Sequence, residues 1–323
     1  MSVGTVVAES CSFDVNEEAL IALGHELKGR GYAFVTVTPA TQARVNARAD
    51  AARARDLRGV FGWSRPFDEK LLEPSLLALA NAAGILFATE DGLRSRVRWS
   101  SLGPDLFVHS AYPTDASDCV FFGPDTVRFH AFLCRAAPRS VARMVDVGCG
   151  SGAGGIALAR HLHEVGELVL ADVNAEALKF ARVNAAVAEI SARCVLSDVM
   201  SAVADRVDLV ISNPPYLLDP KERTYRSGGG ALGADLSLRI AREAASRLFT
   251  GGTLLLYTGA AIVDGSDPFL AEVVPVLEAA GAAVRYEELD PDVFGEELST
   301  PAYRTAERLA VVGVEAVFAS TTE

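Results

Sequence analysis

The sequence predicts an α/β protein whose larger part is a doubly wound parallel sheet, preceded by a smaller α+β domain. In the second half of the 323-residue chain, short apolar runs rich in β-branched residues alternate with longer helical patterns, as in successive βαβ units. The first of these runs leads into a glycine-rich turn, which is where such sheets bind ligands. We place the boundary between a front domain, residues 1–115, and a main domain, residues 116–323.

The main domain is expected to contain five buried strands and an antiparallel hairpin at the end of the chain. The strands are predicted at residues 144–147, 168–173, 194–199, 207–211 and 254–257, and the hairpin at 283–289 and 308–318. Helices fit at 127–136, 175–188, 235–248 and 268–280, and a further helix opens at 154–159. The connection 290–307 is long for a compact domain, and such loops are often functional. Its acids and Tyr303 are therefore candidates to shape a substrate pocket.

The sequence of the front domain predicts helices followed by a two-stranded ribbon, a pattern typical of a winged-helix-like module. Helices are expected at 16–30, 40–58 and 69–83, with a strand at 32–38 and the ribbon at 93–100 and 105–110. Arg94, Arg96 and Arg98 alternate along one predicted strand and would share a face. Five more arginines crowd the second helix. These rows fit either a surface for an anionic substrate or nucleic acid, or two solvated faces.

Composition limits the classes of partner and the cellular setting. A formal net charge of −12 disfavours a protein that binds nucleic acid through its overall charge, but it does not exclude a local basic groove. No apolar run is long enough to cross a bilayer, and the first residues lack the pattern of a secretion signal. The five cysteines are scattered, and no two have metal-ligand spacing. We therefore expect a cytoplasmic protein with no membrane association and no metal.

The stretch at residues 207–216, VDLVISNPPY, is the strongest candidate for the reactive site. An apolar run stops at two prolines, which cannot donate ladder hydrogen bonds and which hold the preceding residues extended. A stiff segment beyond a central strand would present the Asn213 carboxamide, two carbonyl oxygens and the Tyr216 ring. Taken alone, the stretch could also be an ordinary proline-stopped loop.

A second candidate site is the glycine-rich turn at residues 146–152, DVGCGSG. Glycines allow the backbone to pass close to a ligand and the strand-to-helix turn to close tightly. Asp172 ends the next predicted strand, at the spacing of an acid that binds ribose hydroxyls. Asp125 and Thr126, in GPDT, could cap the helix that follows or reach a ligand over the sheet. Asp146 could likewise cap the glycine turn.

Together these motifs resemble class I S-adenosylmethionine-dependent methyltransferases. The glycine order GxGxG with Asp146 ahead of it separates the chain from nicotinamide enzymes. NPPY narrows the resemblance to methyltransferases of amino and amide nitrogens, and the set with GPDT and the glycine-rich stretch 228–233 is similar to the release-factor glutamine methyltransferases and the methyltransferase small domain group. The resemblance covers residues 118–318 and implies a Rossmann-like sheet of seven strands.

The resemblance also implies a cofactor, a reaction and residue roles. S-adenosylmethionine would contact Asp125, Thr126, Asp146, Gly148, Gly150, Gly152, Asp172, Asp198 and Asn213. The Asn213 side-chain oxygen and the Pro214 carbonyl would accept hydrogen bonds from the target nitrogen, and Tyr216 would stack on a flat amide or base. The substrate would be a protein glutamine or a related amide or amine. The alternatives are an exocyclic base amine in RNA or DNA, and a non-catalytic scaffold that binds the cofactor.

Overall fold

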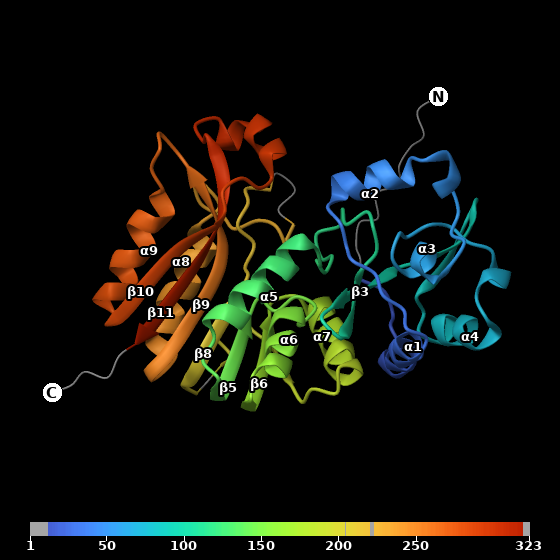
Figure 1. Cartoon of the computed structure of the whole chain (residues 1–323), viewed down its shortest axis with the longest axis horizontal. Coiled ribbons are helices and arrows are strands. Elements are labelled where there is room, and N and C mark those ends of the chain that lie inside the picture. The colour runs from blue at the N-terminus through green and yellow to red at the C-terminus, as the bar shows by residue number, and fades with distance from the viewer. Residues whose placement is uncertain (1–11, 204, 220–222, 319–323) are drawn as a thin grey trace.

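The structure, a computed structural model, describes residues 12–203, 205–219 and 223–318, and its centre is a mixed sheet of seven strands (Figure 1). The strand order is β10-β11-β9-β8-β5-β6-β7. The five strands from β9 to β7 are parallel, and β11 runs antiparallel to both β9 and β10. The bounds are β5 (Ser140–Val147), β6 (Glu164–Asp172), β7 (Arg193–Leu196), β8 (Val207–Ser212), β9 (Leu248–Ile262), β10 (Ala282–Asp290) and β11 (Arg308–Phe318). This topology confirms the predicted doubly wound sheet and its terminal hairpin.

Helices cover both faces of the sheet because its central strands are apolar on both sides. In β8, Leu209 and Ile211 join the core beneath α5 and α6, whereas Val210 joins the core beneath α8 and α9. The helices of this part are α5 (Pro124–Ala136), α6 (Ala153–His161), α7 (Ala175–Val187), α8 (Asp235–Arg247) and α9 (Pro268–Ala279). Each lies within a few residues of its predicted range.

The front part departs further from the prediction. Its helices are α1 (Glu17–Gly29), α2 (Pro39–Asn46), α3 (Leu57–Phe61) and α4 (Pro74–Ala82), with 3₁₀ turns η1 (Ala49–Ala51) and η2 (Glu69–Leu71). Its strands form two ribbons, β1 (Leu86–Thr89) with β2 (Gly92–Ser95), and β3 (Val97–Leu102) with β4 (Asp105–Ser110). The predicted helix at 40–58 is broken, because Asp56 caps a new helix at α3. The predicted strand at 32–38 is extended but joins no sheet.

The predicted row of three arginines on one strand is wrong. A bend at Arg96 separates β2, which carries Arg94, from β3, which carries Arg98. Arg96 is exposed and Arg94 is half-buried, whereas only 5% of the Arg98 surface is accessible to solvent. The strand alternation that would place them together is therefore interrupted between the first and the last.

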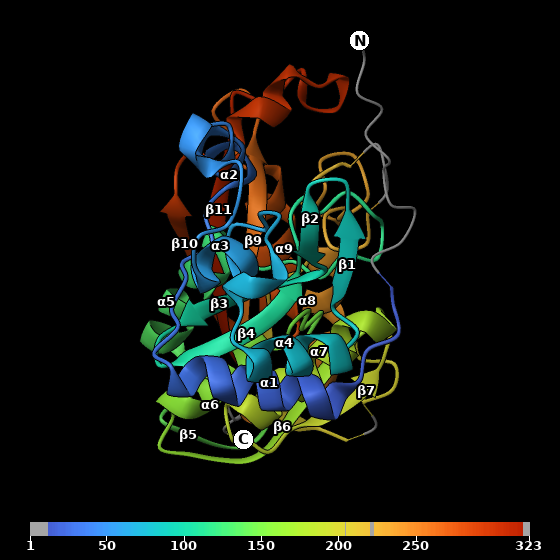
Figure 2. The same ribbon diagram turned by 90° about the vertical axis from the view of Figure 1, so that its right-hand side faces the viewer.

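The front part packs on α7 through an apolar core that both share. Trp99 is fully buried there with Val183 and Val187 of α7, and α1 lies along the same helix (Figure 2). A side chain at Gly24 of α1 would come within 2.6 Å of Trp99 and 2.7 Å of Val187, so the close approach of α1 requires glycine. The proposed domain boundary at 115/116 stays a prediction.

Buried Asn184 of α7 adds a polar connection at the same interface. Its side-chain oxygen accepts from the Val108 N–H at 2.6 Å, and its Nδ2 donates to the carbonyls of Val108 at 3.0 Å and Ser151 at 2.8 Å. One side chain thus joins β4 of the front part to the glycine-rich turn.

The structure bears on the expectations about membrane association, metal binding and the cysteines. Among the described residues, no helix is long and apolar enough to cross a membrane, and no group of three or more His, Cys, Asp or Glu side chains could hold a metal ion. Cys119 is disulfide-bonded, whereas Cys134, Cys149 and Cys194 are free. The cytoplasmic setting stays a prediction.

We predict that Asn184→Ala lowers the free energy of unfolding by roughly 2–4 kcal/mol, because it leaves several buried backbone groups without partners. Asn81→Ala, on the exposed side of α4, is the matched control and should change it by less than about 0.5 kcal/mol. Urea unfolding of both variants measures the difference. Equal stability of the two variants would contradict the proposed connection.

Candidate functional site

The site begins where two neighbouring strands end together. Val147, the last residue of β5, lies opposite Ser212, the last residue of β8, and the Ser212 hydroxyl donates to the Val147 carbonyl at 2.7 Å. The glycine-rich turn leaves the sheet after Val147, and the segment Asn213-Pro214-Pro215-Tyr216, called here the NPPY segment, leaves it after Ser212. Both motifs therefore lie at the carboxyl edge of a parallel sheet, beside the point where the chain order reverses.

The glycine-rich turn presents backbone rather than side chains to a cavity. Gly148 and Gly150 adopt left-handed backbone conformations, with φ of +67° and +54°, and a Cβ at either position would meet open space. Both line the cavity. Gly152, also predicted to bind the cofactor, does not line it. A Cβ at Gly152 would come within 3.0–3.2 Å of Ile156, Leu170 and Ala181, so this glycine closes the turn against the core.

Two carboxylates hold the turn in place. Asp172, at the end of β6, accepts hydrogen bonds from the N–H groups of Gly150 and Asn174, each at 2.8 Å. Each oxygen keeps a lone pair for a ligand. Asp146 accepts from the Gly155 N–H at 2.8 Å and so caps the start of α6. Complete burial raises the pKa of Asp146 to about 7, and the nearby Asp172 carboxylate adds to this. Burial also raises the pKa of Asp172.

Two further predicted cofactor residues lie at the edge of this cavity. Asp198 lines it, but β7 ends before Asp198, and the exposed carboxylate pairs with the guanidinium of Arg239 at 2.8 Å. Thr126 also lines the cavity, and its hydroxyl oxygen accepts from the Gly123 N–H at 3.2 Å, as expected of a residue that caps α5.

Asp125 lies elsewhere, and it anchors the NPPY segment. The Tyr216 hydroxyl donates to Asp125 Oδ2 at 2.5 Å, and the Tyr257 hydroxyl and the Arg128 guanidinium donate to Oδ1 at 3.2 and 3.1 Å. Asp125 is buried, and burial beside this carboxylate raises the pKa of Tyr216 well above its usual value. Asp125 therefore does not line the cavity of the glycine turn, and the prediction that it contacts the cofactor finds no support in its position.

Asn213 and Pro214 keep their hydrogen-bond acceptors unused. Among the described residues, none donates to the Asn213 side-chain oxygen or to the Pro214 carbonyl oxygen. Asn213 is half-buried and Pro214 is buried. The two prolines and the Tyr216 anchor fix the backbone, so these acceptors are held in place without being consumed.

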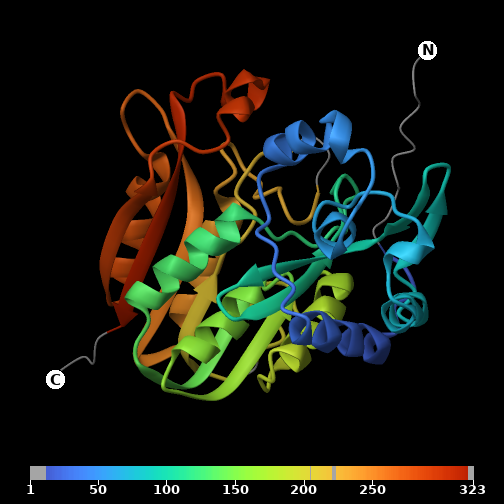
Figure 3. The same cartoon turned by 45° about the vertical axis from the view of Figure 1, so that its right-hand side comes forward.

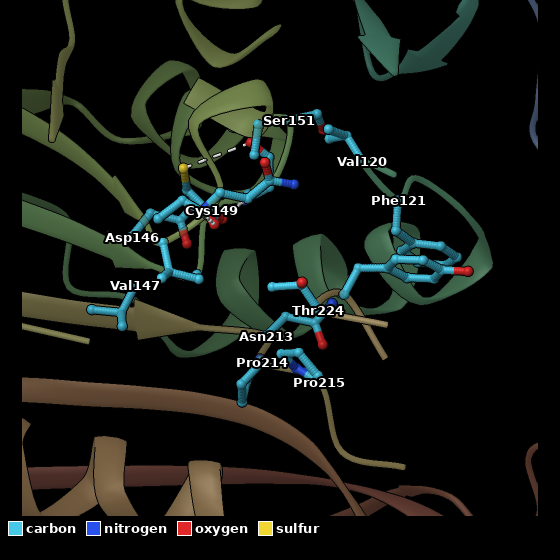
Figure 4. Close-up of a pocket in the computed structure, with 18 of the residues that line it drawn as sticks. Val120, Phe121, Asp146, Val147, Cys149, Ser151, Asn213, Pro214, Pro215 and Thr224 are labelled. Carbon is cyan, nitrogen blue, oxygen red and sulfur yellow. Dashed lines mark hydrogen bonds between the residues drawn. The ribbon is translucent and has the colours of Figure 1, made fainter. Parts of the chain in front are cut away.

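The NPPY segment is a wall shared by two cavities. The first, the glycine-loop cavity, lies between the glycine-rich turn and Asn213, Pro214 and Pro215 (Figure 4), and contains about 1000 Å³ of empty space, part of it open to solvent. The second, the front cavity, is lined by the same residues and contains about 1380 Å³ of empty space, part of it open to solvent. Phe121 and Tyr225, whose rings are parallel at 6.1 Å between centroids, also line both.

Segments far apart in sequence build the front cavity, among them α2, the NPPY segment and the 290–307 connection. Residues 36–42 come from the front part, residues 213–217 from the NPPY segment, and Asp292, Val293, Phe294 and Glu296 from the 290–307 connection. The connection, with η3 (Gly295–Ser299) and η4 (Pro301–Tyr303), lies on the same side of the molecule as α2 (Figure 3). The Tyr303 hydroxyl accepts from the Leu218 N–H at 2.9 Å and so ties the connection to the segment after NPPY.

Sequence reasoning missed Phe121, Tyr225 and Arg98, all of which line these cavities. Phe121 lies directly before the GPDT motif, and its aromatic character was the only sign of a role. For Arg98, the sequence pattern indicates only membership of a charged row.

Comparisons with known proteins agree with this geometry. The family model described as "Methyltransferase small domain" matches residues 130–274. A release factor glutamine methyltransferase of Koribacter versatilis is 31% identical over 155 residues, which is 44% of this chain and 55% of that protein. A ribosomal RNA small subunit methyltransferase C of Hamiltonella defensa is 36% identical over 120 residues, 36% of this chain and 32% of that protein. The match thus spans about half or less of each relative.

Among solved structures, the 16S rRNA N2 G1207 methyltransferase of T. Thermophilus, in complex with AdoMet and guanosine, aligns with 88% of this chain and 73% of its own. The identity is 19% and the TM-score 0.45, too low to support any conclusion about activity. The match to the family model and the relatives' names agree with the glycine turn, Asp172 and the NPPY segment at one sheet edge. Residues 130–274 of this chain are thus similar to the methyltransferase small domain family.

Proposed function

We propose that this chain is an S-adenosylmethionine-dependent N-methyltransferase that modifies an amide or amine nitrogen. The observation that carries the proposal is that Asn213 and Pro214 line two cavities at once, and that no described residue donates to their side-chain and carbonyl oxygens. One cavity would hold the cofactor and the other the substrate. The reacting nitrogen and the methyl donor would then approach each other at the NPPY segment.

The residues of the glycine-loop cavity fit S-adenosylmethionine. Gly148 and Gly150 leave room for a ligand where a side chain would stand, and Asp172 offers two oxygens to a pair of vicinal hydroxyls. Val173, Val199 and Ile240 supply apolar surface to the same cavity, as a flat base requires. We assign Asp146 to the turn itself, since its observed partner is the Gly155 N–H.

The NPPY segment would orient the acceptor nitrogen. The bound cofactor would supply a methyl group on a sulfonium sulfur. The nitrogen lone pair would form the new N–C bond, and the electron pair of the broken C–S bond would stay on sulfur. Asn213 Oδ1 and the Pro214 carbonyl would accept the two N–H bonds of a planar nitrogen and favour the positive charge that develops there. The excess proton would leave by these acceptors to solvent, so no dedicated base is required.

We propose a protein glutamine or a related amide or amine as the substrate. The relatives' names point to a protein in one case and to ribosomal RNA in the other. The net charge of −12 disfavours a large nucleic-acid surface, which leaves methylation of an exocyclic base amine as the alternative. A scaffold without catalysis would have no need for acceptors held free at the junction of two cavities.

The first test is Asn213→Ala. With radiolabelled S-adenosylmethionine and cell extract, transfer should fall by about 10²–10³-fold, since a fixed polar group at the reacting atom is lost. Binding of S-adenosylhomocysteine should persist, because Gly148, Gly150 and Asp172 are unchanged. Asn81→Ala is the control and should transfer label as the wild type does. Full transfer by Asn213→Ala would show that this side chain is not catalytic.

The second test separates the anchor of the NPPY segment from the cluster around it. Tyr216→Phe removes the hydrogen bond between the segment and Asp125, and should lower the transfer rate about tenfold through misplacement of Asn213. Tyr257→Phe removes a hydrogen bond to the same carboxylate but leaves the NPPY segment unchanged. It should therefore lower the transfer rate less than Tyr216→Phe does. S-adenosylhomocysteine affinity should be equal in both. A larger loss in Tyr257→Phe would be inconsistent with positioning by Tyr216.

The third test uses the raised pKa of Asp146. Because its pKa is 3.8 in the unfolded chain and about 7 when folded, the carboxyl contributes stability that is complete below pH 3.8 and is lost as pH rises through 7. Relative to Asp146→Asn, which keeps an acceptor for Gly155, the wild type should lose roughly a few kcal/mol of unfolding free energy across this range.

Urea unfolding of both proteins between pH 4 and 9 measures this difference. The difference in unfolding free energy between the two proteins should change between pH 4 and pH 7 and stay constant above pH 7. A difference that is the same at pH 4 and pH 8 would mean that Asp146 does not titrate with a raised pKa.

A further inference from the structure

The front cavity contains a buried cation that has no counter-ion among the described residues. Arg98 lies on β3 and lines the cavity, with only 5% of its surface accessible. Its Nε donates to the Ser110 carbonyl at 3.3 Å. Among the described residues, no carboxylate lies within ion-pair distance of the guanidinium, and its two terminal nitrogens have no hydrogen-bond partner.

The other arginines of this cavity are paired, which makes Arg98 distinctive. Arg128 lies 3.1 Å from carboxylate oxygens of both Asp125 and Asp290, and Arg226 pairs with Glu297. Burying a guanidinium without a partner is costly, since it gives up its hydration. Burial lowers the pKa of Arg98 to about 10, so the group still carries its charge at neutral pH.

Among the described residues, no carboxylate pairs with Arg98. Tyr32 and Tyr112 interact with its charge, and the Tyr32 hydroxyl already donates to the Trp99 carbonyl at 3.0 Å. His109, directly opposite on β4, is fully buried, and burial together with the Arg98 charge holds its pKa well below the usual value. The free guanidinium nitrogens therefore have only the cavity to face.

A second unpartnered group lines the same cavity. Gln42 of α2 is fully buried, and its Nε2 donates to the Trp63 carbonyl at 2.9 Å. Its Oε1 has no hydrogen-bond partner among the described residues. A buried acceptor left unpaired costs about 1–3 kcal/mol. The Gln42 Oε1 is itself enclosed by protein, so the group that faces the cavity without a partner is the Arg98 guanidinium, and a bound anion could pair with it.

We propose that Arg98 binds an oxyanion, a carboxylate or a phosphate, on the molecule that occupies the front cavity. The planar guanidinium matches such a group with two parallel hydrogen bonds. A single enclosed arginine suits one small or terminal anionic group, whereas a nucleic-acid backbone requires many exposed cations. If the proposed function holds, this molecule is the methyl acceptor, with its anionic end at Arg98 and its nitrogen at Asn213.

The test measures anion binding without any methyl transfer. Thermal unfolding of the full chain is followed at constant ionic strength in chloride, with inorganic phosphate in one arm and acetate in the other. The wild type should gain about 2 °C or more at ten times the dissociation constant of the bound anion. The unfolding temperature of Arg98→Met should rise by about 2 °C less than that of the wild type. Any rise that remains is the general effect of the salt.

The variants distinguish a ligand-binding role from a structural one. Without added phosphate or acetate, Arg98→Met should unfold at the same temperature as the wild type or higher, because it replaces an unpaired buried charge with an apolar side chain. Arg128→Met is the matched control from the same cavity: it breaks existing ion pairs and should unfold earlier while keeping the response to anions. If Arg98→Met does not fold, Arg98→Lys replaces it in the test. This variant keeps the positive charge but loses the paired donors of the guanidinium, so it should bind the anion about tenfold more weakly than the wild type.

The response to each arm identifies the source of the oxyanion. A gain with phosphate alone supports a phosphate, a gain with acetate alone supports a carboxylate, and a gain with both supports a site that accepts either. Equal responses of the wild type and the Arg98 variants in both arms would overturn the proposal. Absence of S-adenosylhomocysteine binding in a protein that shows the anion response would instead count against the proposed function.

Discussion

The hydrogen bond between the Tyr216 hydroxyl and buried Asp125 is the contact on which the site depends. It joins the NPPY segment, at the end of β8, to the start of α5, with Tyr257 and Arg128 satisfying the other carboxylate oxygen. With two prolines restricting the backbone and this bond fixing its end, the segment stands as a stiff wall. Two cavities can then share Asn213 and Pro214, whose side-chain and carbonyl oxygens accept no hydrogen bond from the described residues.

Much of the main part follows from local sequence. Strand ends, the glycine-rich turn and Asp172 could be predicted because buried parallel strands are continuous apolar runs, and because the left-handed conformations at Gly148 and Gly150 demand glycine. The meeting of the turn and the NPPY segment follows from topology, since parallel strands bring their carboxyl ends to one edge. The sequence therefore predicted which residues lie at the mouth of the sheet.

The front part could not be predicted as well, because tertiary contacts decide it. Residues 32–38 alternate as a strand does, yet they stay extended without a ladder; instead the Phe34 N–H donates to the Ser101 hydroxyl and its carbonyl accepts from the Ser101 N–H. Alternating arginines suggested a charged face, but the bend at Arg96 sends Arg98 inward. The placement of Asp125 at the front cavity likewise depends on Tyr216, which lies 91 residues away in sequence.

Locating the transferred methyl group tests the central claim most directly. After incubation of the wild-type protein with labelled S-adenosylmethionine and cell extract, the labelled product is isolated and its methyl position determined by mass spectrometry and NMR. The account predicts a methyl group on a planar amide or amine nitrogen. A methyl group on carbon or oxygen, or no labelled product in any protein, nucleic-acid or small-molecule fraction, would contradict it.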